Sequence, residues 1–195
     1  LAQRLDAPDL EDTVYFRYPR GSDYPYPGPD IDPGRIRHES LLRALYGNDA
    51  DAVRAQTAAV SWAPSGRQLR FSSQHGASEA LRLAGESLDR LLPYDLRYHV
   101  TTTAGTFVWR VIRGTNRLSA HAFAIALDIN TEDADYWRWR RDHTNLEYRN
   151  RIPLAIVEIF EAHGFIWGGK WYHYDTMHFE YRPELLHPAC STGAE

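Results

Sequence analysis

The chain of 195 residues has the size of one ordinary domain with an added arm, not of two independent domains. Its 43% hydrophobic and 25% charged residues exclude a disordered chain, and its net charge of -4 excludes a general attraction to nucleic acid or to an anionic membrane. The single cysteine, Cys190, excludes an intrachain disulfide and a thiolate metal cluster, and no apolar run reaches the roughly 18 residues that span a bilayer.

Residues 1–38 are predicted to form an extended N-terminal arm that is rich in proline and tyrosine. The stretch Tyr24-Pro25-Tyr26-Pro27-Gly28-Pro29 cannot be a regular helix, because proline fixes φ and removes an N–H donor. We expect the arm to lie across the body with its tyrosines as anchors; a floppy terminus is the alternative. Residues 39–195 would then form a single domain.

Five segments are predicted to be helical from their apolar spacing and from the residues that would end them. Gly47 would end the first of them, Pro93 the third, and Gly164 the last. The fourth carries two tryptophans. In chain order these segments are residues 39–46, 49–59, 78–92, 136–141 and 151–163.

The remaining segments read as short strands. Two strands, 60–62 and 68–72, flank a Pro64-Ser65-Gly66 turn, and two more, 98–102 and 107–112, are predicted to form a hairpin around Ala104-Gly105. Strands are also expected at 123–130, 165–167 and 177–181. In residues 123–130, large apolar residues alternate with small or polar ones, so the alanine side should lie close against another element. These patterns predict an α+β fold with a small antiparallel sheet.

Asp128 interrupts the small-residue side of this strand, where a lone buried carboxylate would be unfavourable unless it were paired with a cation or bound to a metal. An ion pair with an arginine is one possibility. A metal site is the other, and it requires His121 to lie on a bend before the strand, because odd and even positions of a strand face opposite ways. His178 lies in a second apolar strand. Two imidazoles and one carboxylate leave a tetrahedral zinc ion one open position, as in catalytic sites.

Three motifs together resemble the zinc D-alanyl-D-alanine peptidase family. They are Ser119-x-His121 with Asp128, then Gly168-Gly169-x-Trp171, and then Asp175-x-x-His178-Phe179-Glu180. The family includes D,D-carboxypeptidases, D,D-dipeptidases and phage L-alanyl-D-glutamate endolysins, and it shares its fold with the hedgehog signalling domain. The resemblance covers roughly residues 105–186, the motif-bearing part of a single peptidase domain 39–195, and Ala124 departs from it by replacing the usual glycine.

The resemblance implies one zinc ion per chain, with His121, Asp128 and His178 as its ligands. Asp175 would be the general base, which must take a proton from water and therefore should not be a ligand itself. A base of this kind contributes about 10²- to 10⁴-fold to the rate.

The resemblance also implies that Ser119 and an upstream arginine hold the substrate. We expect Arg110 to bind a terminal carboxylate through a bidentate contact, with Arg113 and Arg117 as alternatives. All three arginines could instead be solvated. Trp171 is expected to wall the cleft.

Two further residues near the motif have open assignments. His173 is a rival ligand, or a hydrogen-bond donor to the substrate oxyanion. Glu180 shares a strand face with His178 and would either orient that imidazole or form a surface salt bridge. The other histidines are expected to be structural or exposed; they are His38, His75, His99, His143, His163 and His187.

These expectations point to zinc-dependent hydrolysis of peptidoglycan stem peptides, with D-alanyl-D-alanine carboxypeptidase as the leading activity. An L-alanyl-D-glutamate endopeptidase, a non-catalytic hedgehog-like zinc or binding module, and a structural domain with an ion-paired Asp128 are the alternatives. The partner would be a peptidoglycan peptide, with no nucleic acid. Because the sequence starts at Leu1, we expect a removed leader and a periplasmic or secreted protein, and a cytoplasmic one is left open.

Overall fold

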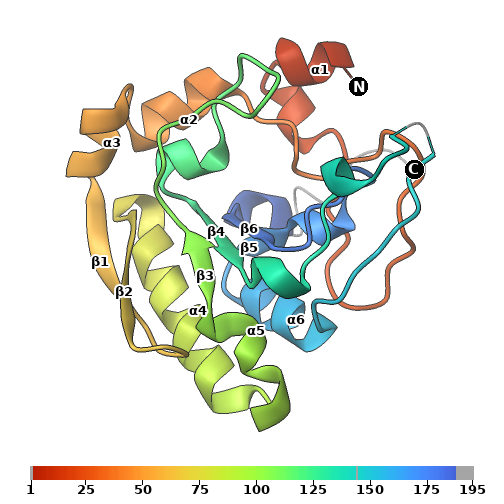
Figure 1. Ribbon diagram of the computed structural model, residues 1–195. Helices are drawn as coiled ribbons and strands as arrows, with labels where there is room; N and C mark the ends of the chain where they lie inside the picture. The colour runs from red at the N-terminus through yellow and green to blue at the C-terminus, as the bar shows by residue number, and fades with distance from the viewer. Residues whose placement is uncertain (1, 144, 188–195) are drawn as a thin grey trace.

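The computed structural model describes residues 2–143 and 145–187, so Cys190 lies outside the described part (Figure 1). Within that part, short antiparallel strands and surrounding helices form an α+β fold, as predicted. The helices are α1 (Ala2–Asp6), α2 (Glu39–Tyr46), α3 (Ala50–Ala55), α4 (Ala77–Leu91), α5 (Tyr98–Thr101) and α6 (Leu154–Ala162). The strands are β1 (Thr57–Trp62), β2 (Arg67–Ser72), β3 (Thr103–Gly105), β4 (Ala126–Ile129), β5 (Phe165–Trp167) and β6 (His178–Tyr181).

The central sheet has the strand order β3-β4-β6-β5, with antiparallel neighbours. Leu127 pairs with Phe179, and Asp128 pairs with His178 one position along. Because side chains alternate between the faces of a sheet, the first pair faces one side and the second pair the other. The sheet therefore has an apolar face and a face that carries titratable side chains.

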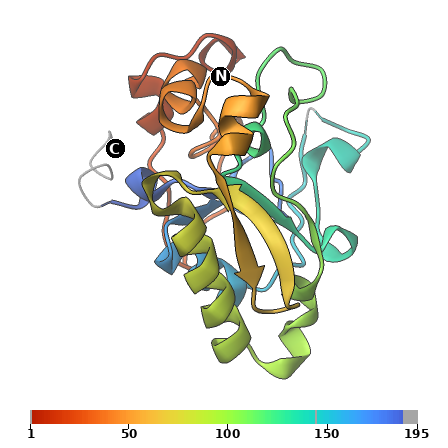
Figure 2. The same ribbon diagram turned by 90° about the vertical axis from the view of Figure 1, so that its left-hand side faces the viewer.

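The apolar face forms the main hydrophobic core. Phe179 stacks on Phe160 of α6 with ring centroids 4.0 Å apart, and Phe160 also stacks against Trp62 of β1 at 6.2 Å. The antiparallel hairpin β1–β2 curves beside α4, and α4 contacts α6 (Figure 2). These layers hold the rear of β4 and β6 rigid, so their opposite face is a fixed platform.

Two predicted helices are shorter than expected. The segment 49–59 is helical only in α3, because Thr57 already begins β1. The segment 136–141 forms only a 3₁₀ turn at Trp137–Trp139. The predictions for 39–46, 78–92 and 151–163 are confirmed to within a few residues, and Gly164 follows α6 with φ +88°.

The predicted hairpin of 98–102 with 107–112 is wrong. Residues 98–101 form helix α5, and β3 pairs with β4 instead. Residues 107–112 lie alongside the segment that leads to the first motif: Val108 N–H donates to His121 O at 3.2 Å, and Ser119 N–H donates to Arg110 O at 3.0 Å. This pairing places Arg110 next to Ser119.

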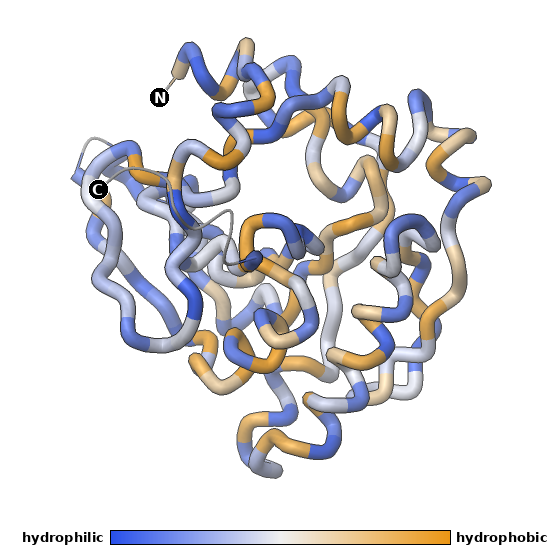
Figure 3. The backbone as a smooth tube through the Cα atoms, turned by 180° about the vertical axis from the view of Figure 1, so that it is seen from behind, coloured by the Kyte–Doolittle hydropathy of each residue, from blue (hydrophilic) through white to orange (hydrophobic). Residues whose placement is uncertain are grey.

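The first 38 residues wrap around the body and are not extended throughout, because they include α1 and a 3₁₀ turn at Glu11–Val14. Figure 3 shows their loops largely in blue and white, the colours of hydrophilic and intermediate residues. Tyr18 O–H donates to Glu161 at 2.7 Å, and Lys170 donates to the same carboxylate at 2.5 Å. Tyr26 O–H donates to Tyr172 O at 2.7 Å. The tyrosines thus anchor this segment.

No helix among the described residues combines the length and the apolar character needed to cross a membrane.

Candidate functional site

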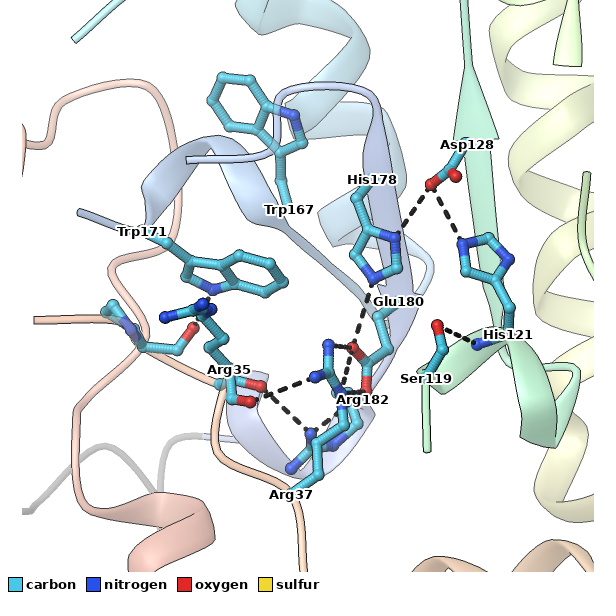
Figure 4. Close-up of polar contacts among 12 residues, drawn as sticks. Arg35, Arg37, Ser119, His121, Asp128, Trp167, Trp171, His178, Glu180 and Arg182 are labelled. Atoms are coloured by element: carbon cyan, nitrogen blue, oxygen red, sulfur yellow. Dashed lines mark hydrogen bonds and ion pairs between the residues drawn. The ribbon is translucent and has the colours of Figure 1, made fainter. Parts of the chain in front are cut away.

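Asp128 and His178 meet because they are direct cross-strand partners on the polar face of the sheet. His178 Nδ1 lies 2.9 Å from Asp128 Oδ1 (Figure 4). Ala126, two residues before Asp128, pairs with Glu180 on the same face. The small alanine leaves room there for the larger acidic and imidazole side chains, in accord with the expected tight face.

His121 joins them from a 3₁₀ turn, Ala120–Phe123, that precedes β4. Ser119 caps this turn, since its hydroxyl accepts from His121 N–H at 3.4 Å. Ala124 then adopts a left-handed conformation with φ 53° and reverses the chain into the strand. His121 Nε2 consequently lies 3.2 Å from Asp128 Oδ1. The bend that convergence of His121 and Asp128 required is present.

Ala124 stands at a backbone position that favours glycine, which explains the glycine usual in the resembling family. We expect Ala124→Gly to change the free energy of unfolding by less than about 1 kcal/mol, because relief of about 1–2 kcal/mol of left-handed strain offsets the loss of a buried methyl. Ala124→Val should destabilise by more than about 2 kcal/mol, since a branched side chain at positive φ meets a fully packed surrounding. Urea unfolding measures both variants. Equal stability of the valine and glycine variants would contradict the strain argument.

The hydrogen bonds of the two imidazoles fit a metal centre. His121 Nδ1 lies 3.0 Å from the carbonyl of Thr106, which can only accept, so Nδ1 carries the proton and Nε2 presents a lone pair. Nε2 of His121 is buried without a hydrogen-bond partner. The ligating atoms of His121, Asp128 and His178 all lie within 4.8 Å of one another. Two nitrogens and one oxygen suit zinc and leave a further coordination position open.

The electrostatics of the three side chains are tightly coupled. Burial alone would raise the pKa of Asp128, but the adjacent His121 and His178 hold it well below its usual range. Burial alone would lower the pKa of His178. The contacts of His178 with Asp128 and Glu180 outweigh the effect of burial and raise this pKa to about 10. A cation at this point therefore replaces protons that the side chains would otherwise hold.

Glu180 is fully buried, so the surface salt bridge considered for it is ruled out. Its carboxylate lies 3.5 Å from His178 Nε2, and Arg37 donates to both of its oxygens at 2.5–2.9 Å. Arg182 donates to it at 3.3 Å. Although burial raises the pKa of Glu180, the two arginines and His178 hold it well below its usual range. Glu180 therefore remains ionised and fixes the edge of the His178 ring opposite Asp128.

Asp175 lies in the cleft beside this group, and one of its carboxylate oxygens is buried without a hydrogen-bond partner. Burial raises the pKa of Asp175 to about 6, a change that the charge of Asp128 reinforces and His178 opposes. Its backbone N–H donates to Gly168 O at 2.9 Å. A side chain on Gly168 would place Cβ 2.6 Å from Asp175 O, so the glycine of the second motif permits this close approach.

A cleft of about 930 Å³ opens over the three candidate ligands. Arg110, Ser119 and Arg117 lie along one wall, as the alternation of the paired segments requires. Arg110 is exposed, whereas Arg117 is half-buried and its Nε, which has no hydrogen-bond partner, lies 3.5 Å from Asp6 of α1. Burial and the neighbouring arginines lower the pKa of Arg117. Arg113 is not among the residues that line the cleft.

Trp171 packs against the site more than it lines it. Its side chain is only 3% exposed, its ring lies 5.7 Å from that of His178, and its Nε1–H donates to Pro33 O at 2.6 Å. Trp171 therefore supports the His178 ring and ties the N-terminal segment to the site.

The contribution of the N-terminal segment to the cleft was not predicted from the sequence. Arg35 and Arg37 line it, and Asp32 lies directly behind His173, which also lines it. The only sequence signal was the run Asp32-Pro33-Gly34-Arg35, a turn followed by alternating basic residues. Nothing in that run indicated where the turn would dock.

Comparison with known proteins finds a similarity over the part of the chain that carries the candidate ligands. A family model described as D-alanyl-D-alanine carboxypeptidase matches residues 113–181, which hold all three candidate ligands and Asp175. No curated protein and no solved structure matches the chain. The match supports a peptidase that acts on D-alanyl-D-alanine or on peptidoglycan, and the relation to the hedgehog fold stays a prediction. Arg110 and the N-terminal segment lie outside the matched stretch.

Proposed function

We propose that the protein is a zinc-dependent peptidase that hydrolyses peptidoglycan stem peptides, with D-alanyl-D-alanine carboxypeptidase as its activity. The observation that carries the proposal is the convergence of His121, Asp128 and His178 at an open cleft, with Asp175 beside them. The family match over residues 113–181 supports the substrate class. A peptidoglycan substrate favours a periplasmic or secreted protein.

The side chains divide the chemistry among them. A zinc ion held by His121, Asp128 and His178 would polarise the scissile carbonyl and make water nucleophilic at neutral pH. Asp175 takes the proton of the attacking water and can pass it to the leaving amine, since its pKa of about 6 lies close to neutrality. His173 lines the cleft and does not belong to the group of candidate ligands, so we assign it the role of a donor to the substrate oxygen.

The charge of the cleft favours an anionic substrate. Arg35, Arg37, Arg110, Arg117 and Arg138 line it, and burial together with the neighbouring guanidinium groups lowers the pKa of Arg117. A free C-terminal carboxylate would relieve this crowding of positive charge and would gain charge-assisted hydrogen bonds. Arg110, opposite Ser119 on the cleft wall, is the proposed carboxylate-binding residue. Arg117 is its rival because its Nε makes no hydrogen bond, although it lies 3.5 Å from Asp6.

An endopeptidase remains the second candidate because the cleft is large. Asp175, Tyr136 and residues of α1 all line it, and its volume of about 930 Å³ offers room for more than one terminal residue. A non-catalytic binding module is less favourable, because it would have no use for the buried carboxylate oxygen of Asp175 that lacks a hydrogen-bond partner.

Mass spectrometry of a stem pentapeptide incubated with the zinc-loaded protein tests the activity. We expect loss of one terminal D-alanine, and no cleavage once the C-terminal carboxylate is amidated. Arg110→Ala should lower kcat/KM by about 10- to 100-fold, mainly through KM, because charge-assisted hydrogen bonds contribute about 1.5–3 kcal/mol.

Arg117→Ala is the matched comparison, since both arginines lie on the same wall. A larger loss of kcat/KM in Arg117→Ala than in Arg110→Ala would show that Arg117, and not Arg110, binds the substrate carboxylate. Cleavage between L-alanine and D-glutamate that is insensitive to amidation would establish the endopeptidase instead.

A further inference from the structure

Asp32 is a fully buried carboxylate that the N-terminal segment inserts behind the cleft. Its Oδ1 accepts from the backbone N–H of His173 at 2.9 Å, and its Oδ2 lies 2.8 Å from His173 Nδ1. Arg35 donates to Oδ2 at 2.6 Å. Burial would raise the pKa of Asp32, but His173 and Arg35 lower it below its usual value, so the side chain is ionised.

The turn that carries Asp32 is fixed at several points. Tyr172 N–H donates to Ile31 O at 3.0 Å, and Trp171 Nε1–H donates to Pro33 O at 2.6 Å. Gly34, at φ +82°, has no room for a side chain, because a Cβ there would lie 2.5 Å from Ile166 Cδ1. The position of the carboxylate is therefore set by the packing of the turn on the sheet and does not depend on its own hydrogen bonds alone.

This arrangement fixes the imidazole of His173. An ionised carboxylate can only accept, so Nδ1 of His173 carries the proton that faces Asp32. The His173 ring packs against Trp137 in a T-shaped arrangement, with ring centroids 4.7 Å apart. This contact restricts rotation of the imidazole. Nε2 is the nitrogen that remains for the cleft, which His173 lines together with the candidate ligands and Asp175.

We infer that Asp32 is a positioning residue for catalysis: it holds His173 so that Nε2 faces the substrate and, in the doubly protonated ring, donates a hydrogen bond to the reacting carbonyl oxygen. Arg35 donates to Oδ2 of Asp32 at 2.6 Å and helps to hold the carboxylate in place. This inference rests on the proposed peptidase function. It makes the N-terminal segment part of the active site, although the segment lies outside the stretch that matches the peptidase family.

Attachment of the segment does not depend on Asp32 alone. Tyr18 with Glu161, and Tyr26 with Tyr172, form separate links at other places along the segment. These links supply a control, because Tyr26→Phe removes the hydrogen bond of the segment to the carbonyl of Tyr172 but no hydrogen bond of the His173 side chain.

Kinetics of the zinc-loaded variants form the first part of the test. We expect Asp32→Asn to lower kcat by about 10- to 100-fold and to change KM by less than about threefold. The hydrogen bond from His173 stabilises mainly the transition state, so a misoriented imidazole slows the reaction without weakening substrate binding. Zinc content should stay at the wild-type level, and Tyr26→Phe should retain wild-type kcat. His173→Gln, which keeps a donor near the position of Nε2, should retain more activity than His173→Ala.

A double-mutant cycle separates positioning from attachment. If Asp32 acts through His173, Asp32→Asn combined with His173→Ala should be no slower than His173→Ala alone. Additive losses, or an equal loss in Tyr26→Phe, would overturn the inference and leave Asp32 as an anchor.

The second part of the test does not depend on enzymatic activity, and it can be carried out on the wild-type protein. Nitrogen-15 NMR of the imidazoles in the zinc-loaded protein should place the proton of neutral His173 on Nδ1, and Asp32→Asn should move it at least partly to Nε2. A proton on Nε2 in the wild type would overturn the inference even where Asp32→Asn fails to fold. A tautomer that depends on Asp32 in a protein that cleaves no stem peptide would support the positioning and reject the proposed function.

Discussion

Alanine at His121, Asp128 or His178 should abolish zinc binding in each case, lowering the affinity by more than the roughly 100-fold that loss of an outer partner causes. Each substitution removes one of the three atoms that lie within 4.8 Å of one another, and no described acid or histidine is grouped with them as a replacement. Peptidase activity should be lost together with the metal. Metal analysis after dialysis, followed by a competitive chelator titration, measures the effect against about one zinc per chain in the wild type.

Two variants serve as controls for the zinc measurement. His173→Ala should keep full zinc, because its Nδ1 is engaged by Asp32. Glu180→Gln should lose about 10- to 100-fold in affinity, since it removes the carboxylate beside His178 Nε2 without removing a ligand. Full zinc occupancy in His178→Ala, or loss of zinc in His173→Ala, would reject the proposed ligand set.

The sequence carries enough information to single out Asp128 and His178. Asp128 interrupts an apolar strand, His178 lies in a second strand that also carries Glu180, and charged groups in such positions need partners. The strands at 165–167 and 177–181 were predicted from their apolar runs and turn residues, and they are present as β5 and β6. The register that sets Asp128 directly opposite His178 could not be predicted, because it depends on how the two strands slide past each other during packing.

The segment before the first motif shows where pattern reading fails. Residues 98–102 and 107–112 are rich in β-branched and aromatic residues around Ala104-Gly105, which suited a hairpin, yet 98–101 is helical and Arg110 pairs with Ser119. Short segments lack a decisive periodicity, so their partners are chosen by tertiary contacts. The bend at Ala124, in contrast, was required by geometry once His121 and Asp128 were assumed to converge.

The N-terminal segment was predicted to dock through its tyrosines, and Tyr18 and Tyr26 do so. Its chemical contribution was not predicted, because Asp32 lies 141 residues from His173, and Arg37 lies 143 residues from Glu180. No local pattern encodes contacts of that separation. They arise because the polar face of the sheet leaves buried charges, and the segment supplies the opposite charges that stabilise them.

Asp175→Asn should leave zinc content intact and lower kcat by about 10² or more, because an amide of the same shape cannot accept the proton of the attacking water. KM should change little, since the substrate contacts are unaffected. Asp175 is suited to this test because its backbone is held by Gly168 and its carboxylate has an unpartnered oxygen, so the substitution breaks no hydrogen bond of that oxygen.

Stability provides the control that separates catalysis from structure in Asp175→Asn. Burial raises the pKa of Asp175 to about 6, so above that pH the ionised carboxylate is less favourable in the folded protein than in the unfolded chain. In the metal-free protein at pH 8, Asp175→Asn should therefore unfold at the same or a higher urea concentration than the wild type, while the zinc-loaded variant remains inactive. Asp175→Glu, which restores a carboxylate, should recover part of kcat. Near-normal turnover of Asp175→Asn would show that Asp175 is structural and would shift the role of base to His173 or Glu180.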